Sequence, residues 1–202
     1  MNNGGVALRA MLLWVCRSEL EMKHNEHRLI NRKVVIAMAV GIVGRLIPHV
    51  PNVTPLLGLS LFSGANLPRW SAFLTVILTL VVSDVALAFM YGYPIFSFWT
   101  LFTYSGFIAV MAIGSRFRKV LSRWSGLLYV FSASLGFWLW TNFGVWLIGG
   151  LYPKTFAGLG FCYVAALPFL RNAMIGDIIW SAVFFGLFAL GRRRFAHGKF
   201  YL

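Results

Sequence analysis

Acidic residues are scarce in this sequence. Its 202 residues include 18 lysines and arginines but only 5 aspartates and glutamates, and charged residues make up 11% of the chain. A soluble domain has about a quarter of its residues charged. This shortage of charge, together with 59% hydrophobic residues, excludes an ordinary soluble globular domain. It indicates instead a protein that crosses a lipid bilayer several times.

Cysteines and nucleotide-binding motifs are also scarce or absent. The two cysteines, Cys16 and Cys162, lie far apart and form no CxxC or zinc-binding pattern. The sequence contains no GxxxxGK[ST], GxGxxG or HExxH motif. We therefore expect no cofactor and no metal site, and any ATP that drives its function must be hydrolysed by another chain.

Hydrophobic segments divide the chain into a basic N-terminal segment (1–33), a transmembrane domain (34–191) and a basic tail (192–202). The fold class that follows is an all-α membrane bundle of about six helices with both termini in the cytoplasm. The expected spans are residues 34–47, 55–67, 70–91, 96–115, 125–147 and 172–190. The second is too short for a straight crossing and is expected to be tilted, or discontinuous and sheltered by its neighbours. The glycine-rich residues 148–168 are expected to form a loop with a half-buried helix at 159–167.

The positive charges predict the orientation of this bundle. With the N-terminus in the cytoplasm, 15 of the 18 lysines and arginines lie on the inner side: six before residue 34, Arg69, four in 116–123 and four in the tail. Arg45, Lys154 and Arg171 are left on the outer side. This positive-inside bias predicts a cytoplasmic (inner) membrane protein. It also explains the net charge of +13 without nucleic acid, because the basic residues flank alternate helix ends instead of sharing one face.

Two aspartates are expected inside the membrane. Asp84 and Asp177 are the only acidic residues after Glu26, and an ionisable group in a span costs about 2.5–3.5 kcal/mol on insertion scales. At about 1.5 Å per residue, both lie roughly 10 Å below the outer surface. Arg45 and Asn142 are expected at a similar depth. Four polar groups at one level predict a solvent-accessible site, although a structural ion pair between Arg45 and an acid is the simpler alternative.

The fifth span adds aromatic side chains at the same end. Trp138, Asn142 and Trp146 are spaced four residues apart, so they face one way on a helix. An aromatic wall with one amide suits a flat, polar small molecule. The alternative is that these tryptophans face the lipid or belong to the interfacial aromatic belt.

Several short motifs occur together between residues 45 and 177. They are RLIPHVPNVTP at 45–55, SD at 83–84, TNFGVW at 141–146, YP at 152–153, and Asn172 with Gly176-Asp177. In this combination, residues 34–190 resemble a family of uncharacterised six-helix bacterial membrane proteins. That family looks related to the substrate-binding (S) components of energy-coupling factor transporters. The substrate-binding residues that we predict are Arg45, His49, Asn52, Asp84, Asn142, Trp146, Tyr152, Asn172 and Asp177.

The resemblance to S components implies partners. Such proteins capture vitamins or metal ions from outside the cell, and they associate with a transmembrane coupling subunit and two cytosolic ATPases. Their first helix often carries small residues four apart that meet the coupling subunit, to which Ala37 and Gly41 correspond. This pair would serve an internal helix neighbour equally well. The same spacing recurs at Ser60/Gly64, Ser132/Gly136 and Ala182/Gly186.

Three functions compete on these observations. The first is a solute-binding component for uptake of a vitamin-like small molecule in an outward-facing cavity. The main alternative is a structural or assembly protein that binds the bilayer and protein partners but no solute. The third is an intramembrane aspartyl enzyme, of whose motifs only Gly176-Asp177 is partly present. We expect a solute-binding protein that is not an enzyme.

Overall fold

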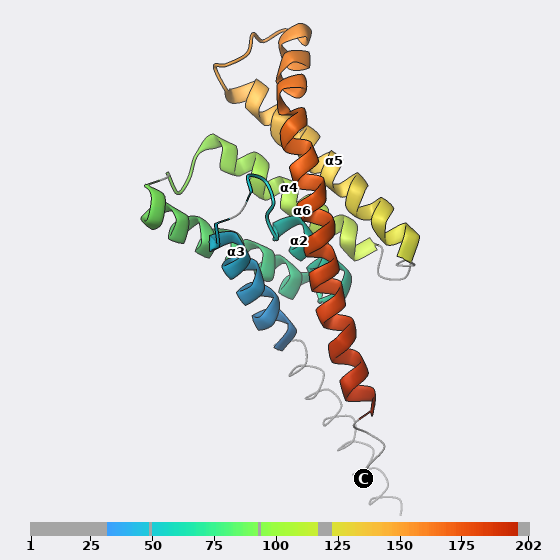
Figure 1. Cartoon of the computed structure of the whole chain (residues 1–202). Coiled ribbons are helices and arrows are strands. Elements are labelled where there is room, and N and C mark those ends of the chain that lie inside the picture. Colours follow the sequence, from blue (N-terminus) through green and yellow to red (C-terminus); the bar gives the residue numbers. More distant parts are fainter. Residues whose placement is uncertain (1–31, 49, 93, 117–122, 198–202) are drawn as a thin grey trace, which may run out of the picture.

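The computed structural model describes residues 32–48, 50–92, 94–116 and 123–197. Residues 32–46 form the first helix within this part. The following helices are α2 (Leu56–Asn66), α3 (Arg69–Tyr91), α4 (Phe98–Arg116), α5 (Arg123–Ile148) and α6 (Phe156–His197) (Figure 1). No described residue belongs to a β-strand, and the expectation of an all-α fold is confirmed for this part of the chain.

Among the described residues, three helices are long and apolar enough to cross a membrane, as expected of a membrane protein. They are α3, α4 and the Phe156–Leu190 part of α6. The 11 residues of α2 extend only about 17 Å, well short of the roughly 30 Å hydrocarbon core. A complete set of six spans, and the side on which each terminus lies, therefore stay predictions.

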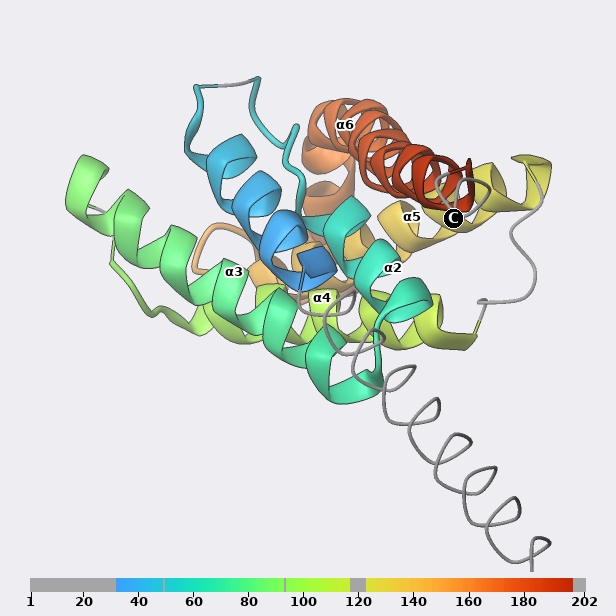
Figure 2. The ribbon, with the colours of Figure 1, turned by 90° about the horizontal axis from the view of Figure 1, so that it is seen from below.

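The short helix α2 lies at the centre of the bundle, among α3, α4 and α6 (Figure 2). Nine of its 11 residues are buried. One side, with Leu57 and Leu61, packs into a core shared with α3, α4 and α5. The other side, with Leu59 and Phe62, packs against helix 32–46 and α6. A helix too short to span is thus enclosed by longer neighbours, which shield its backbone ends from lipid.

Glycines bring α2 unusually close to its neighbours. A methyl group on Gly64 would lie 2.0 Å from the Met111 carbonyl oxygen of α4, and one on Gly114 of α4 would lie 2.6 Å from the Leu61 carbonyl oxygen. A methyl group on Gly58 would come within 2.7 Å of the backbone nitrogen of Ser181 in α6. The backbones of α2, α4 and α6 are therefore in direct contact, which only glycine permits at these positions.

The C-terminal third of the chain differs from the sequence-based expectation. Instead of a loop with a half-buried helix at 159–167 and a separate span at 172–190, one helix runs from Phe156 to His197. It continues through Pro168 and into the basic tail, and it crosses the other helices (Figure 1). Proline and glycine signals favour a break, but neighbouring helices can satisfy backbone groups near a proline in a membrane helix.

Helix α5 supplies the contacts that hold the first part of α6 in place. The indole N–H of Trp138 donates to the Ala166 carbonyl oxygen at 3.1 Å, two residues before Pro168. The Trp138 ring also packs on Tyr163, with 5.2 Å between the centroids. The Tyr163 hydroxyl donates to the Leu139 carbonyl oxygen at 3.1 Å. Tertiary contacts therefore outweigh the local preference for a loop.

Candidate functional site

Arg45 and Asp84, which the sequence predicts to be at one depth, form an ion pair. Arg45 Nη1 lies 2.6 Å from Asp84 Oδ1. The same nitrogen donates to Ser83 Oγ at 2.7 Å. The Tyr104 hydroxyl donates to the second carboxylate oxygen, Asp84 Oδ2, at 2.6 Å. Helix 32–46, α3 and α4 thus contribute to one polar cluster, which we call the Arg45 cluster: Arg45, Ser83, Asp84 and Tyr104.

The carboxylate in this cluster is fully engaged, whereas the guanidinium is not. Each oxygen of Asp84 has its own partner. Arg45 uses only Nη1, and its Nε and Nη2 make no hydrogen bond within the described part of the chain. The side chains of Arg45 and Asp84 are 17% and 18% exposed. The cluster therefore holds an arginine in a fixed position, with donors still available at a partly accessible place.

Asp177 does not join this cluster. It is 5% exposed on α6 and lies beside Ser134 of α5. The α6 side chain next to Gly44, the neighbour of Arg45, is Trp180, whose ring would be 2.5 Å from a methyl group on Gly44. The two intramembrane acids therefore occupy separate surroundings, one paired with arginine and one among serines.

Asn142 points back along its own helix. Its Nδ2 donates to the Trp138 carbonyl oxygen at 2.8 Å. Its backbone carbonyl accepts a contact from the Cys162 thiol at 3.5 Å. In this geometry its amide nitrogen serves α5 itself and does not meet Arg45 or Asp177.

Trp146 is hydrogen-bonded to the connection between α5 and α6. Its indole N–H donates to the Pro153 carbonyl oxygen at 2.9 Å. The ammonium group of Lys154 donates to the carbonyl oxygens of Trp146 and Gly149, and it lies 5.8 Å from the Trp146 ring centroid. A cation at the C-terminal end of α5 is favourable because carbonyl oxygens accumulate there. The sequence did not single out this role for Lys154.

The remaining predicted site residues lie apart from the Arg45 cluster or outside the described chain. His49 is not among the described residues. Asn52 is exposed in the turn between helix 32–46 and α2, with a left-handed backbone (φ 67°) that asparagine tolerates better than most residues. Tyr152 lies in the connection between α5 and α6, and Asn172 lies in α6. Both are half-buried.

The small-residue pair of the first helix is covered within the chain. Ala37 is 3% exposed and packs in a cluster with Leu59 and Phe184. A methyl group on Gly41 would lie 3.0 Å from side-chain atoms of Leu59 and Thr79. The sequence allows this pair to contact either an internal helix or a partner subunit. In the structure it contacts internal neighbours.

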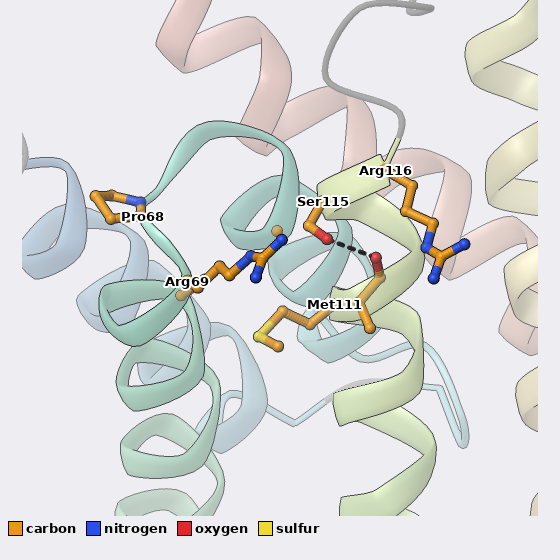
Figure 3. A pocket seen from close by; sticks show the side chains of 8 residues that line it. Pro68, Arg69, Met111, Ser115 and Arg116 are labelled. Carbon is orange, nitrogen blue, oxygen red and sulfur yellow. Dashed lines mark hydrogen bonds between the residues drawn. The ribbon is translucent and has the colours of Figure 1, made fainter.

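A pocket of about 580 Å³ lies at the opposite end of α3 from Asp84, between the α2–α3 turn and the end of α4 (Figure 3). The side chain of Arg69 reaches from α3 toward α4 (Figure 3). No residue of the predicted site lines this pocket. It is lined by Gly64, Pro68, Arg69, Ala72, Met111, Ala112, Ser115 and Arg116.

Comparison with known proteins places the chain in a family. Residues 24–198 match a family described as a family of unknown function, DUF6580. The chain belongs to this family. No curated protein and no solved structure matches the chain. Membership in DUF6580 confirms the resemblance to an uncharacterised family, whereas the relation to transporter S components stays a prediction.

The Arg45 cluster has the groups for recognition through charge and hydrogen bonds. Within the described ranges, no three His, Cys, Asp or Glu side chains lie close enough together to hold a metal ion. Arg45 offers a planar set of donors that suits carboxylate, phosphate or carbonyl groups. The phenol of Tyr104 and the hydroxyl of Ser83 add polar atoms beside it.

Proposed function

We propose that this DUF6580 protein is a membrane-embedded solute-binding component for uptake of a small, vitamin-like molecule, and that Arg45 reads the polar end of the solute. The observation that supports this proposal is the half-engaged guanidinium of Arg45. Asp84 and Ser83 fix its Nη1 atom, and the side chain is 17% exposed. An arginine oriented in advance loses little freedom when a ligand binds, which favours affinity.

The cost of the Arg45 cluster supports a functional role for it. Replacing a buried ion pair by apolar side chains of similar size is often neutral or stabilising. A bundle that needs only stability could therefore place apolar residues at Arg45, Asp84 and Tyr104. A binding site, in contrast, needs the charge and tolerates its cost.

The proposed ligand carries a carboxylate, phosphate or carbonyl group on a flat body. The guanidinium fork pairs with such oxygens through two parallel hydrogen bonds. Aromatic rings near the outer ends of α4 and α5 are available to stack on the rest of the molecule. Asn52, Trp146, Tyr152 and Asn172, with His49 beyond the described residues, stay candidates for the rim of the site.

In this proposal the protein has six spans, lies in the inner membrane with both termini in the cytoplasm, and receives solute from outside. The sequence contains no ATP-binding motif, so energy must come from elsewhere. By analogy with S components, a transmembrane coupling subunit with cytosolic ATPases would supply it. Because Ala37 and Gly41 are buried, such a subunit would have to meet another face of the first helix.

The competing function is a structural membrane protein without a solute. It is favoured by the way the Asp84 carboxylate is satisfied inside the chain by Arg45 and Tyr104. In that case the cluster would act as a clamp between helix 32–46, α3 and α4. The two functions predict different results for a stable variant that lacks the Arg45 cluster: the first predicts that it no longer binds solute, and the second predicts that neither it nor the wild type binds one.

The decisive variant combines Arg45→Met, Asp84→Leu and Tyr104→Phe, which removes the charges while keeping side-chain volume. The protein and the variant would be purified in lipid nanodiscs. Native mass spectrometry would detect a co-purified small molecule, and Tm would be screened against vitamins and other small acids. We expect a ligand on the wild type, and a variant that is equally stable but binds none.

Arg69→Gln provides the control, because it removes one arginine at the opposite end of α3. It should keep the ligand. A wild type that carries no small molecule and is stabilised by no compound, in a strain whose deletion leaves vitamin uptake normal, would establish the structural function instead. A triple variant that still binds the ligand would remove Arg45 from the site.

A further inference from the structure

Three buried serines differ from most helical hydroxyl groups in the described part of the chain. A serine or threonine inside a helix can donate to the carbonyl oxygen three or four residues earlier, which satisfies it locally. Eight helical hydroxyls do so, those of Ser60, Thr75, Thr79, Ser83, Thr103, Ser105, Ser115 and Thr141. The buried hydroxyls of Ser63, Ser134 and Ser181 make no such bond to their own helices, and none of them has a partner at full hydrogen-bond geometry in the described part of the chain.

Two of these three serines flank Asp177. Ser181 follows Asp177 by four residues, so the two side chains stand on one face of α6. Ser134 approaches the Asp177 carboxylate from α5. Asp177 and Ser181 are each 5% exposed and Ser134 is 1% exposed. The Asp177 carboxylate, the Ser134 hydroxyl within its reach and the Ser181 hydroxyl one helical turn away are the three oxygen-bearing groups of what we call the oxygen cluster between α5 and α6.

The carboxylate in this oxygen cluster lacks a cationic partner. Arg45 is committed to Asp84, and no lysine, arginine or histidine among the described residues lies within ion-pair distance of Asp177. An isolated charge with so little exposure is unfavourable in an apolar surrounding unless something neutralises it. The cluster offers only oxygen ligands and one negative charge, which matches the preference of a small, hard cation.

We propose that Asp177, Ser134 and Ser181 bind a sodium ion between α5 and α6. A single carboxylate balances the charge of a monovalent cation, whereas a divalent cation would leave one positive charge uncompensated in a poorly solvated place. The ion would also give the two hydroxyl oxygens the partner that they lack within the helices.

Non-helical backbone lies next to the proposed sodium site. Residues 50–55 connect helix 32–46 to α2, and a methyl group on Gly176 would lie 2.8 Å from Val53 Cα. Ion sites in membrane bundles commonly combine side-chain oxygens with carbonyls of backbone that has left the helix. This segment, which touches the residue before Asp177, and water are the candidates that we propose for the remaining coordination.

Sodium binding can be measured without knowing the solute. The full chain in nanodiscs would be tested for binding of ²²Na⁺ at equilibrium. Its Tm would be followed as NaCl replaces choline chloride or KCl at constant ionic strength. We expect one sodium ion per chain and a saturable rise in Tm with NaCl, because a ligand that binds only the folded state stabilises it.

Two variants test the assignment to this cluster. Asp177→Asn keeps the shape of the side chain and should abolish sodium binding. The double variant Ser134→Ala with Ser181→Ala keeps the acid and should weaken sodium affinity about tenfold or more. It keeps the proposal testable if Asp177→Asn does not fold. Ser60→Ala is the matched control, because its buried hydroxyl already donates to the Leu56 carbonyl oxygen at 2.8 Å.

A wild type that binds no sodium would overturn the proposal. Unchanged sodium binding in Asp177→Asn would overturn it as well. Neither result depends on Arg45 or on the proposed solute, so this test and the test of solute binding can fail independently.

Discussion

Tyr104 is the residue that connects α4 to the ion pair of the first and third helices. Its hydroxyl donates to Asp84 Oδ2 at 2.6 Å, and without it one carboxylate oxygen would have no partner in a poorly solvated place. Hydrogen bonds to charged groups contribute about 1.5–3 kcal/mol. The phenol therefore helps Arg45 to stabilise the Asp84 carboxylate.

Tyr104→Phe should therefore lower the stability of the protein by about 1.5–3 kcal/mol. The measurement is Tm, or unfolding by denaturant, in the same detergent for wild type and variant. Tyr163→Phe is the matched control, because its hydroxyl donates to the uncharged Leu139 carbonyl at 3.1 Å in an exposed position. It should cost about 1 kcal/mol or less. Equal losses in the two variants would mean that Asp84 does not need the phenol.

At this scale the sequence predicted part of the polar cluster. An ion pair between Arg45 and one of the two aspartates was a stated alternative, because ionisable groups in spans are rare and need partners, but the sequence did not indicate which aspartate. Tyr104 could not be predicted, because it is one of seven tyrosines and nothing in its spacing marks it. Asn142 was expected to face a ligand, yet its amide donates to Trp138, four residues earlier. This hydrogen bond depends on the rotamer of Asn142, which cannot be predicted from the sequence.

At the scale of helices, identical motifs have different uses. The Ser60/Gly64 pair brings α2 against α4, where a methyl group on Gly64 would lie 2.0 Å from a backbone oxygen. The Ser132/Gly136 pair has the same spacing, but a methyl group on Gly136 would meet nothing within 4 Å. Small residues four apart therefore permit close helix contact without specifying it.

Gly64→Ala should destabilise the protein by about 1–3 kcal/mol, because α2 and α4 must separate to admit the methyl group. Gly136→Ala should leave stability unchanged or raise it by up to about 1 kcal/mol, because alanine favours a helix more than glycine does. Comparing Tm of the two variants with wild type provides the measurement. A Gly64→Ala protein as stable as wild type would show that the close contact is unimportant.

The path of α6 could not be predicted from local sequence. Proline at 168 and the glycines around 150–160 favour a break, and these signals are local. The contacts that keep the helix continuous come from Trp138 on another helix. The indole N–H groups of Trp138 and Trp146, on the face predicted to bind ligand, both donate to backbone carbonyl oxygens of the chain. The indole of Trp140 donates to Ser105 Oγ.

For the whole molecule, the charge distribution makes a prediction about sidedness. Residues near 150 should face the outside of the cell and residues near 116 the cytoplasm, because the basic residues gather on the inner side. Gly150→Cys and Arg116→Cys place single thiols at these two exposed positions. Each would be made in a background with Cys16→Ser and Cys162→Ala.

A membrane-impermeant maleimide applied to intact cells should label Gly150→Cys and leave Arg116→Cys unlabelled. Permeabilised cells serve as the control, because both thiols should then react. Labelling of the two positions with the opposite preference would mean that the bundle is inverted. Labelling of both in intact cells would exclude the six-span arrangement.

Composition predicted the class of the molecule but not its internal arrangement. Low charge and long apolar segments are enough to indicate a membrane protein. They do not say which faces meet, because helices that are apolar all round have no distinct buried side. The central place of α2 depends on glycines at 58, 64 and 114, and their contacts become evident only in three dimensions.

The length of α6 has a mechanical consequence. Its 42 residues extend about 63 Å, roughly twice the thickness of the hydrocarbon core. Gly176, which packs on Val53, lies near its midpoint. The helix therefore extends about equally far on both sides of this packing contact inside the bundle. A rotation of α6 as one rigid helix by about 10° at this contact would move each end by about 5 Å in opposite directions, so a displacement at the α5–α6 loop would also move the opposite end of the helix.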